Sequence, residues 1–205
     1  MIPEATCGKV SAQRRVSLWL LPPEPLRCEL QTQINRISAR SDGLCPPFLP
    51  HITILGGVPC SDKTEADEIL SRLRSCLDIG YFDGGVPCCF GHNEVISVRT
   101  QNGAVKWNQS CAVIMKKTPD FLRIIRLLHG AFFPEWEGDV DLESAFPPPL
   151  REPHFSFAYG NKPELCERMS APPDFVSKEA VLMWTYPSSL CGVQSWKEIG
   201  RIQLC

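Results

Sequence analysis

Short segments in which apolar and polar residues alternate predict the strands of this chain. They lie at 16–21, 51–57, 86–90, 94–99, 110–116, 154–160, 175–186 and 194–204. Apolar residues at helical spacing predict helices at 24–39, 61–77 and 119–132, with a short helix at 163–169. This order of elements indicates an α+β fold, in which helices cover one side of antiparallel sheets.

Two of the helices have clear start signals. Ser61-Asp62 precede the helix that ends at Leu77, and Thr118 precedes a helix with proline at its first position. The side chains expected to face the core are Ala66, Ile69, Leu70, Leu73 and Leu77 in the first helix, and Leu122, Ile125, Leu128 and Phe132 in the second. We expect one domain of 205 residues, in which the N-terminal and C-terminal strands form one lobe and the central strands the other.

Three connecting segments carry further expectations. Residues 1–14 are polar and are expected to be loosely ordered, and Asn102-Gly103 predict a tight turn. The acidic, proline-rich segment 134–149 is the longest predicted loop and is a candidate rim or lid.

Composition narrows the class of ligand. A net charge of −2 argues against binding of long nucleic acid, which requires a basic surface to replace counterions. The apolar run near the start, Leu18-Trp19-Leu20-Leu21, is too short to span a membrane or to serve as a signal peptide. We therefore expect a cytoplasmic, monomeric protein with a small ligand and no membrane partner.

The eleven cysteines do not change this expectation. Their number is odd and they form no C-x-x-C pair, so spacing supports neither a zinc site nor a regular disulfide framework. We expect mostly reduced, buried thiols, with one or two bridges at most. Because no cysteine neighbours either histidine motif described next, we expect no nucleophilic cysteine.

Two tetrapeptides share one pattern: His51-Ile-Thr53-Ile and His154-Phe-Ser156-Phe, each preceded by proline. In a strand, the histidine and the hydroxyl residue of each motif point to the same face, and the apolar residues point to the other. A single His-x-Thr is common and is usually structural. The chain has only 4 histidines, however, and two of them stand in matching frames. The repeat therefore indicates a duplicated unit whose two copies meet at one site.

The pair of motifs resembles the 2H phosphoesterase superfamily, and most closely its plant- and yeast-type cyclic phosphodiesterases. The opening segment Val16–Pro22 and the segments that follow Pro50 and Pro153 carry this resemblance. It implies a two-lobed α+β fold, with two antiparallel sheets facing a central cleft and helices on the outer faces. It also implies hydrolysis of 2',3'-cyclic phosphates, or of ADP-ribose 1'',2''-cyclic phosphate, to a monophosphate.

The four motif residues suit this reaction. Two imidazoles can divide the roles of base and acid on opposite sides of phosphorus. The hydroxyls of Thr53 and Ser156 can donate to the phosphate oxygens as negative charge builds on them. No cofactor or metal is required, and the sequence has no carboxylate cluster of the kind that binds magnesium. The pattern leaves open which histidine is the base; the plant-type template would make it His154, with His51 as acid and a 2'-phosphate as product.

Aromatic residues complete the candidate site. The resemblance places a substrate-stacking aromatic at Tyr159 and a cleft aromatic at Trp19, although either ring could instead pack in the core. Trp107 is left without a role. His92 is expected in an exposed loop, and His129 is expected to be a favourable charge at a helix C-terminus.

Two other functions remain open from the sequence. One is an RNA end-processing enzyme of the same superfamily, either 2'-5' ligase-like or a 3'-end exonuclease; the near-neutral charge weighs against it. The other is a nucleotide-binding protein without turnover, which would have no need of two proton carriers.

Overall fold

The computed structural model describes residues 14–78, 82, 84–96, 109–133, 153–160, 169–187 and 189–204. Its helices are α1 (Leu26–Arg40), α2 (Lys63–Leu77), α3 (Pro119–Phe132) and the short 3₁₀ helix η2 (Leu190–Ser195). Its strands are β1 (Arg15–Leu20), β2 (Ile52–Pro59), β3 (Val86–Cys88), β4 (Phe90–Ile96), β5 (Gln109–Met115), β6 (His154–Tyr159), β7 (Phe175–Ser177), β8 (Glu179–Trp184) and β9 (Lys197–Gln203). The segments predicted at 102–103, 134–149 and 163–168, the first 13 residues, Trp107 and the side chain of His92 lie outside the described residues.

Seven of the strands form one antiparallel sheet in the order β4-β5-β6-β2-β1-β8-β9, and β3 and β7 form a second sheet. In the large sheet, the half made of β2, β1, β8 and β9 meets the half made of β4, β5 and β6 between β2 and β6. The register there consists of one pair, Ile52 opposite Phe155. The α+β class is confirmed, and the terminal and central strands occupy separate halves as predicted.

The predicted start of α2 is confirmed in detail. The side chain of Asp62 accepts a hydrogen bond from the backbone N–H of Glu65, and the Glu65 carboxylate accepts one from the backbone N–H of Ser61. The first bond satisfies a donor that the first turn leaves free, and the second fixes the residue that precedes the N-cap. All five side chains predicted to face the core are buried.

α3 begins and ends where the sequence predicts, with the hydroxyl of Thr118 accepting from the N–H of Phe121. The expectation for His129 was wrong. The helix continues to Phe132 and turns His129 into the core, where burial lowers its pKa to about 4. The imidazole is therefore neutral near pH 7 and contributes no charge to the helix end.

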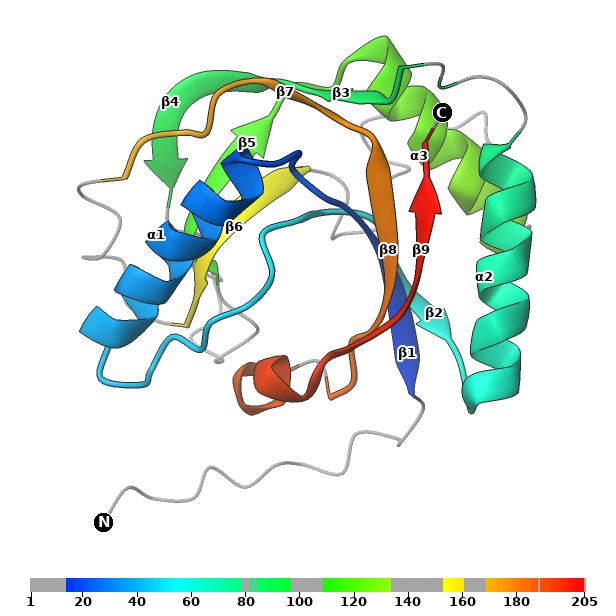
Figure 1. The fold of residues 1–205 in the computed structure, drawn as a ribbon, viewed down its shortest axis with the longest axis horizontal. Coiled ribbons are helices and arrows are strands. Elements are labelled where there is room, and N and C mark those ends of the chain that lie inside the picture. Colours follow the sequence, from blue (N-terminus) through cyan, green and yellow to red (C-terminus); the bar gives the residue numbers. More distant parts are fainter. Residues whose placement is uncertain are drawn as a thin grey trace.

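The two faces of the β1–β8 part of the sheet bury different sets of residues. Val16, Leu18 and Leu20 of β1 belong to the main core, together with the buried residues of all three α-helices. Trp19 points the other way, into a small separate cluster with Leu21, Val181 and Met183. We call this second face the inner face. In Figure 1, α1 lies over the β5–β6 half, and α2 and α3 lie beside β9 and β2.

Three predicted strands are interrupted. The segment 86–90 divides into β3 and the first residue of β4, because β3 pairs with β7 while β4 pairs with β5. The segment 175–186 divides into β7 and β8, because β7 pairs with β3 while β8 pairs with β1 and β9. The segment 194–204 begins with the last residues of η2, and β9 starts only at Lys197. The sequence pattern did not reveal these breaks.

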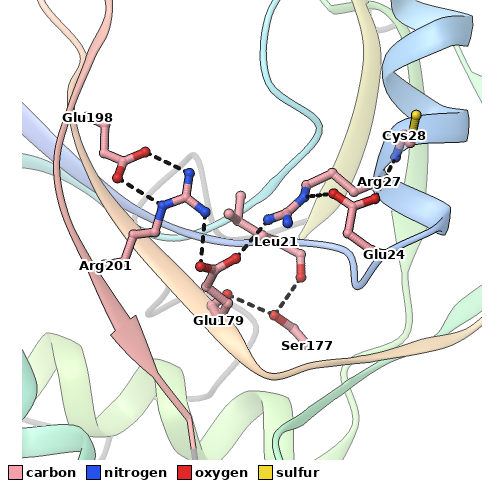
Figure 2. A network of polar contacts seen from close by, with 8 residues as sticks. All are labelled: Leu21, Glu24, Arg27, Cys28, Ser177, Glu179, Glu198 and Arg201. Atoms are coloured by element: carbon pink, nitrogen blue, oxygen red, sulfur yellow. Dashed lines mark hydrogen bonds and ion pairs between the residues drawn. The ribbon is translucent and has the colours of Figure 1, made fainter.

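A charged network ties the first residue of β8 to its neighbours (Figure 2). The carboxylate of Glu179 accepts from Arg27 of α1 at 2.7 Å and from Arg201 of β9 at 2.9 Å. Beside it, the hydroxyl of Ser177 lies 2.8 Å from the carbonyl oxygen of Leu21. The Ser177 contact fastens the residue that follows β1, two positions beyond Trp19, to β7, and the Glu179 contacts fasten β8 to α1 and β9.

Among the described residues, no helix is long and apolar enough to cross a membrane.

Candidate functional site

The junction of β2 and β6 brings the two histidine motifs together. Ile52 and Phe155 face each other across this antiparallel pair, so the residues that flank them share the opposite face. This register sets His51 beside Ser156 and Thr53 beside His154. Each histidine thus lies next to the hydroxyl residue of the other motif, at the one place where the two halves of the sheet meet.

His51 is held between aromatic rings. Its imidazole is 4% exposed and stacks on Trp19, with 3.6 Å between ring centroids and 11° between ring planes. Phe48 meets it edge-on at 5.9 Å. Thr53 lies opposite Trp19 in the β1–β2 register, which places the stacked pair on the inner face.

The hydrogen bonds of His51 identify its tautomer. Its Nδ1 lies 2.6 Å from the carbonyl oxygen of Leu49, which can only accept, so Nδ1 carries the proton. The lone pair is therefore on Nε2, which lies 3.4 Å from the hydroxyl of Tyr159. His51 presents a proton acceptor on the side of the second motif.

Burial lowers the pKa of His51 to about 3. The hydrogen bond to Leu49 acts in the opposite direction, and the charge of His154 lowers the pKa further. His51 is consequently neutral near pH 7.

The second motif has the opposite pattern of exposure. His154 is half-buried and Ser156 is 3% exposed, whereas in the first motif the histidine is buried and Thr53 is half-buried. Among the described residues, the buried hydroxyl of Ser156 forms no hydrogen bond of good geometry, although it interacts with the hydroxyl of Tyr159. A buried donor without a well-formed hydrogen bond marks a place where a ligand oxygen would be well received.

Tyr159 joins the site because β6 is irregular. Tyr159 stands five residues after His154, so strict alternation would point it to the opposite face. The register of β6 with β5 shifts between the pairs of Ser156 and Ala158, which breaks the alternation. The Tyr159 hydroxyl then reaches His51. Burial raises the pKa of Tyr159, and its contact with Ser156 only partly offsets this, so the hydroxyl keeps its proton and can donate it.

Two aromatic residues of the site were missed from the sequence. Phe48 lies 4.3 Å from Tyr159, centroid to centroid, and closes the group on that side. Trp196 meets both Trp19 and Tyr159 edge-on from the segment between η2 and β9. An aromatic three residues before His51 was a usable signal for Phe48. Trp196 had no local signal, because it comes from the other end of the chain.

The remaining chemistry-bearing groups lie elsewhere. Among the described residues, no three His, Cys, Asp or Glu side chains gather where they could hold a metal ion. Cys111 of β5 is disulfide-bonded, and free thiols are present at Cys28, Cys45, Cys60, Cys76, Cys88, Cys89 and Cys191. Burial raises the pKa of Cys60 to about 11 and raises that of Cys88 as well. Neither of these two thiols is poised to act as a nucleophile.

Comparison with known proteins agrees with the motifs. Residues 15–204 match the family model described as cyclic phosphodiesterase-like protein. None of the curated proteins compared with the chain matches its sequence.

Solved structures with related folds are distant in sequence. TT0787 of Thermus thermophilus is 14% identical, with a TM-score of 0.51 over 93% of this chain and 97% of that one. Usb1 of Kluyveromyces marxianus is 13% identical, with a TM-score of 0.48 over 92% and 98%. E. coli LigT complexed with 3'-AMP is 12% identical, with a TM-score of 0.47 over 94% and 98%.

Proposed function

The chain belongs to the cyclic phosphodiesterase-like protein family of 2H phosphoesterases, and on that premise we propose that it hydrolyses cyclic phosphates of small ribose compounds. The substrates are 2',3'-cyclic phosphates or ADP-ribose 1'',2''-cyclic phosphate, and the product is a monophosphate, with the phosphate at the 2' position. The observation that carries the proposal is the register of the β2–β6 junction, which pairs Ile52 with Phe155. In this register, His51 neighbours Ser156 and Thr53 neighbours His154. This register supports a site in which two proton carriers and two hydroxyls lie close together.

The reaction needs a base and an acid on opposite sides of phosphorus. His51 is neutral and offers the lone pair of Nε2, through which it would take the proton of the attacking water. His154, half-buried, would then give a proton to the departing ribose oxygen. This division is the reverse of the one that the plant-type template implies, so a 2'-phosphate product requires the substrate to bind with its 2' and 3' oxygens exchanged relative to that template. It follows from the aromatic environment that surrounds only His51.

The two hydroxyls would stabilise the phosphate. Ser156 has a buried hydroxyl that forms no hydrogen bond of good geometry among the described residues. Thr53 lies across the junction, beside His154. Donors fixed in a site from which water is excluded stabilise developing negative charge without reorganising during the reaction. Each motif would then contribute one proton carrier and one donor to phosphate oxygens.

The roles of Trp19 and Tyr159 follow from their contacts with His51. Trp19 covers one face of the imidazole and so fixes the plane in which Nε2 points. Tyr159 places its hydroxyl at Nε2, where it can donate to the resting base and give way to water when substrate arrives. As predicted from the sequence, both would line the substrate site. They would also orient His51, the proposed general base.

The test is direct turnover of defined substrates. The protein is incubated in EDTA with adenosine 2',3'-cyclic phosphate and with ADP-ribose 1'',2''-cyclic phosphate, and the position of the product phosphate is read by ³¹P NMR. We expect hydrolysis of at least one substrate, with the phosphate left at the 2' carbon. A His154→Ala protein purified in the same way controls for contaminating activity. Absence of turnover of both substrates by folded wild-type protein would refute the proposal.

A further inference from the structure

The segment 41–50 connects α1 to the first motif, and a side chain of α1 holds it where it approaches His51. The side-chain amide of Gln31 donates a hydrogen bond to the carbonyl oxygen of Phe48 at 3.1 Å. α1 packs on β6, so this bond ties the approach to β2 to an element of the other half of the sheet (Figure 1). The two halves are therefore linked beside His51 at a place other than the β2–β6 junction.

The amide of Gln31 has one orientation because its nitrogen has two partners. Nε2 lies 3.1 Å from the carbonyl oxygen of Phe48 and 3.0 Å from Oδ1 of Asn35, one turn further along α1. A backbone carbonyl can only accept, which assigns the nitrogen of the amide to this side. The two N–H groups together hold the Phe48 carbonyl in a fixed direction relative to α1.

Two consecutive peptide planes lie between Gln31 and His51. The first, between Phe48 and Leu49, is held by the bond from Gln31. The second, between Leu49 and Pro50, follows the first closely, because a residue before proline is restricted to extended backbone. Its carbonyl oxygen is the one that lies 2.6 Å from Nδ1 of His51. The direction of the Leu49 carbonyl, and with it the proton on Nδ1, therefore depends on the bond from Gln31.

The same bond also fixes the ring of Phe48. This ring is 7% exposed, meets His51 edge-on at 5.9 Å and lies 4.3 Å from Tyr159. A movement of the Phe48 backbone would displace both the acceptor of Nδ1 and a ring that encloses the imidazole. Both consequences fall on His51.

The second motif is held differently. The carbonyl oxygen of Pro153, the residue before His154, accepts from the backbone N–H of Met115 at 2.8 Å. The approach to His154 thus depends on strand backbone, whereas the approach to His51 depends on a glutamine side chain. Only the second kind of contact can be removed by a substitution that leaves the strands intact.

We propose that Gln31 is a positioning residue for the proposed base: it keeps the Leu49 carbonyl on Nδ1 of His51 and therefore the lone pair on Nε2. The inference rests on the proposed function and adds to it a residue outside the site. Without this bond the Leu49 carbonyl can turn away, and either ring nitrogen can then carry the proton. An Nε2 that carries the proton cannot accept one from water, so the effect falls on kcat rather than on KM.

The experiment compares wild type with Gln31→Glu, which keeps the shape of the side chain but has no N–H to donate. ¹⁵N NMR at pH 7 of protein labelled at histidine, assigned with His51→Gln, shows which ring nitrogen of His51 carries the proton. We expect Nδ1 in wild type and a mixture of both tautomers in Gln31→Glu. On adenosine 2',3'-cyclic phosphate, kcat should fall roughly 2- to 13-fold, as for loss of one hydrogen bond, with KM little changed. Gln31→Lys restores a donor and should keep the wild-type tautomer and most of kcat.

Gln33→Glu is the matched control. Gln33 is also a half-buried glutamine of α1, and its side chain forms no hydrogen bond among the described residues. The change of charge is the same, but the tautomer of His51 and kcat should both stay as in wild type. Unchanged ¹⁵N signals of His51 in folded Gln31→Glu, or an equal change in Gln33→Glu, would overturn the inference.

The tautomer is measured without substrate, which separates this inference from the proposed function. A mixture of tautomers in Gln31→Glu supports the positioning role whether or not cyclic phosphates are hydrolysed. Absence of turnover by wild type would refute the proposed function alone. A fall in kcat that follows the melting temperature, with the ¹⁵N signals of His51 unchanged, would show that the bond from Gln31 serves only stability.

Discussion

The two histidine motifs are almost identical along the chain but lie in opposite environments. In the first, the histidine is buried, stacked on Trp19 and bonded to Leu49, and its hydroxyl partner Thr53 is half-buried. In the second, His154 is half-buried and the hydroxyl of Ser156 is buried. The repeated pattern puts each histidine on the same strand face as its hydroxyl residue. It does not give the two histidines the same surrounding side chains.

This asymmetry suits acid–base chemistry. Two equivalent imidazoles at one site would compete for the same proton, and neither would have a defined role. Burial among aromatic rings lowers the pKa of His51 and keeps it neutral, whereas His154 is only half-buried. The difference between the motifs is therefore what divides their labour in the proposed reaction.

Removal of either imidazole should have the largest effect on the proposed division of roles between the two motifs. His51→Ala and His154→Ala should each lower kcat by roughly 10²–10⁴-fold, the usual worth of a positioned acid or base. Their stabilities should differ, because only His51→Ala empties a space between packed rings. Steady-state kinetics and melting curves of both variants measure the two effects. Near-wild-type turnover in either variant would contradict the proposed roles of base and acid.

The hydroxyls should matter less. Ser156→Ala and Thr53→Val should lower kcat by about 10- to 10³-fold, as for loss of one donor to a developing oxyanion. Ser156→Ala should change stability little, since the buried hydroxyl that it removes forms no hydrogen bond of good geometry among the described residues. Chemical denaturation beside the kinetics checks this. A Ser156→Ala protein that is both less stable and fully active would show that the hydroxyl is structural.

The pH profile sharpens the assignment of the base. A base must be neutral to act, and the neutral fraction falls only as pH drops below its pKa. Since the pKa of His51 is lowered to about 3, kcat/KM should lose nothing to protonation of this base between pH 7 and 5. An unshifted base of pKa about 6.5 would cost roughly 30-fold at pH 5. Stopped assays on protein confirmed as folded at each pH distinguish the two.

Low pH should also lower the free energy of unfolding, because buried histidines cannot easily take up protons in the folded state. The folded pKa values of His51 and His129 are lowered to about 3 and about 4, against an ordinary value of about 6.5 in the unfolded chain. The unfolded state thus binds more protons below pH 6.5, and stability present above that pH is lost as pH falls toward 4. The slope should approach ~1.4 kcal/mol per pH unit for each imidazole. His51→Gln should remove the contribution of one imidazole to the pH dependence of the free energy of unfolding, measured by urea titration.

The smallest expected effect comes from Trp19. Its stack on His51 is worth about 0.5–1.5 kcal/mol by analogy with aromatic pairs, so Trp19→Leu should slow turnover by roughly 2- to 10-fold. Because Trp19 acts through the imidazole, base-bearing and base-free substrates should suffer alike. A loss confined to base-bearing substrates would instead support the stacking role that the family resemblance assigns to this cleft. A melting curve of the variant separates either result from destabilisation.

Local signals in the sequence were sufficient for the bounds of α1, α2 and α3 and for the motif strands. They were not sufficient for the buried face of α3, where Phe121 and Ile124 are buried and the predicted Leu122 and Phe132 are only half-buried. α2 and α3 begin at their predicted caps because a capping side chain bonds to backbone within three residues. The breaks at β7–β8 and before β9 were missed, because their cause is pairing with distant strands. His129 was misjudged for the same reason: its place near a helix end was visible, but the core that covers it was not.

By itself, the sequence determined the α+β class, the parity that puts each histidine on the same face as its hydroxyl, and the family to which the chain belongs. Only the tertiary structure decided that His51 is enclosed by Trp19 and Phe48, that a shift of register brings Tyr159 to Nε2, and that Trp196 stands beside them. Periodicity and capping act over a few residues, whereas burial, and the pKa that follows from it, depends on rings contributed by remote segments. The two similar motifs therefore differ in burial and in surrounding side chains only because of the tertiary structure.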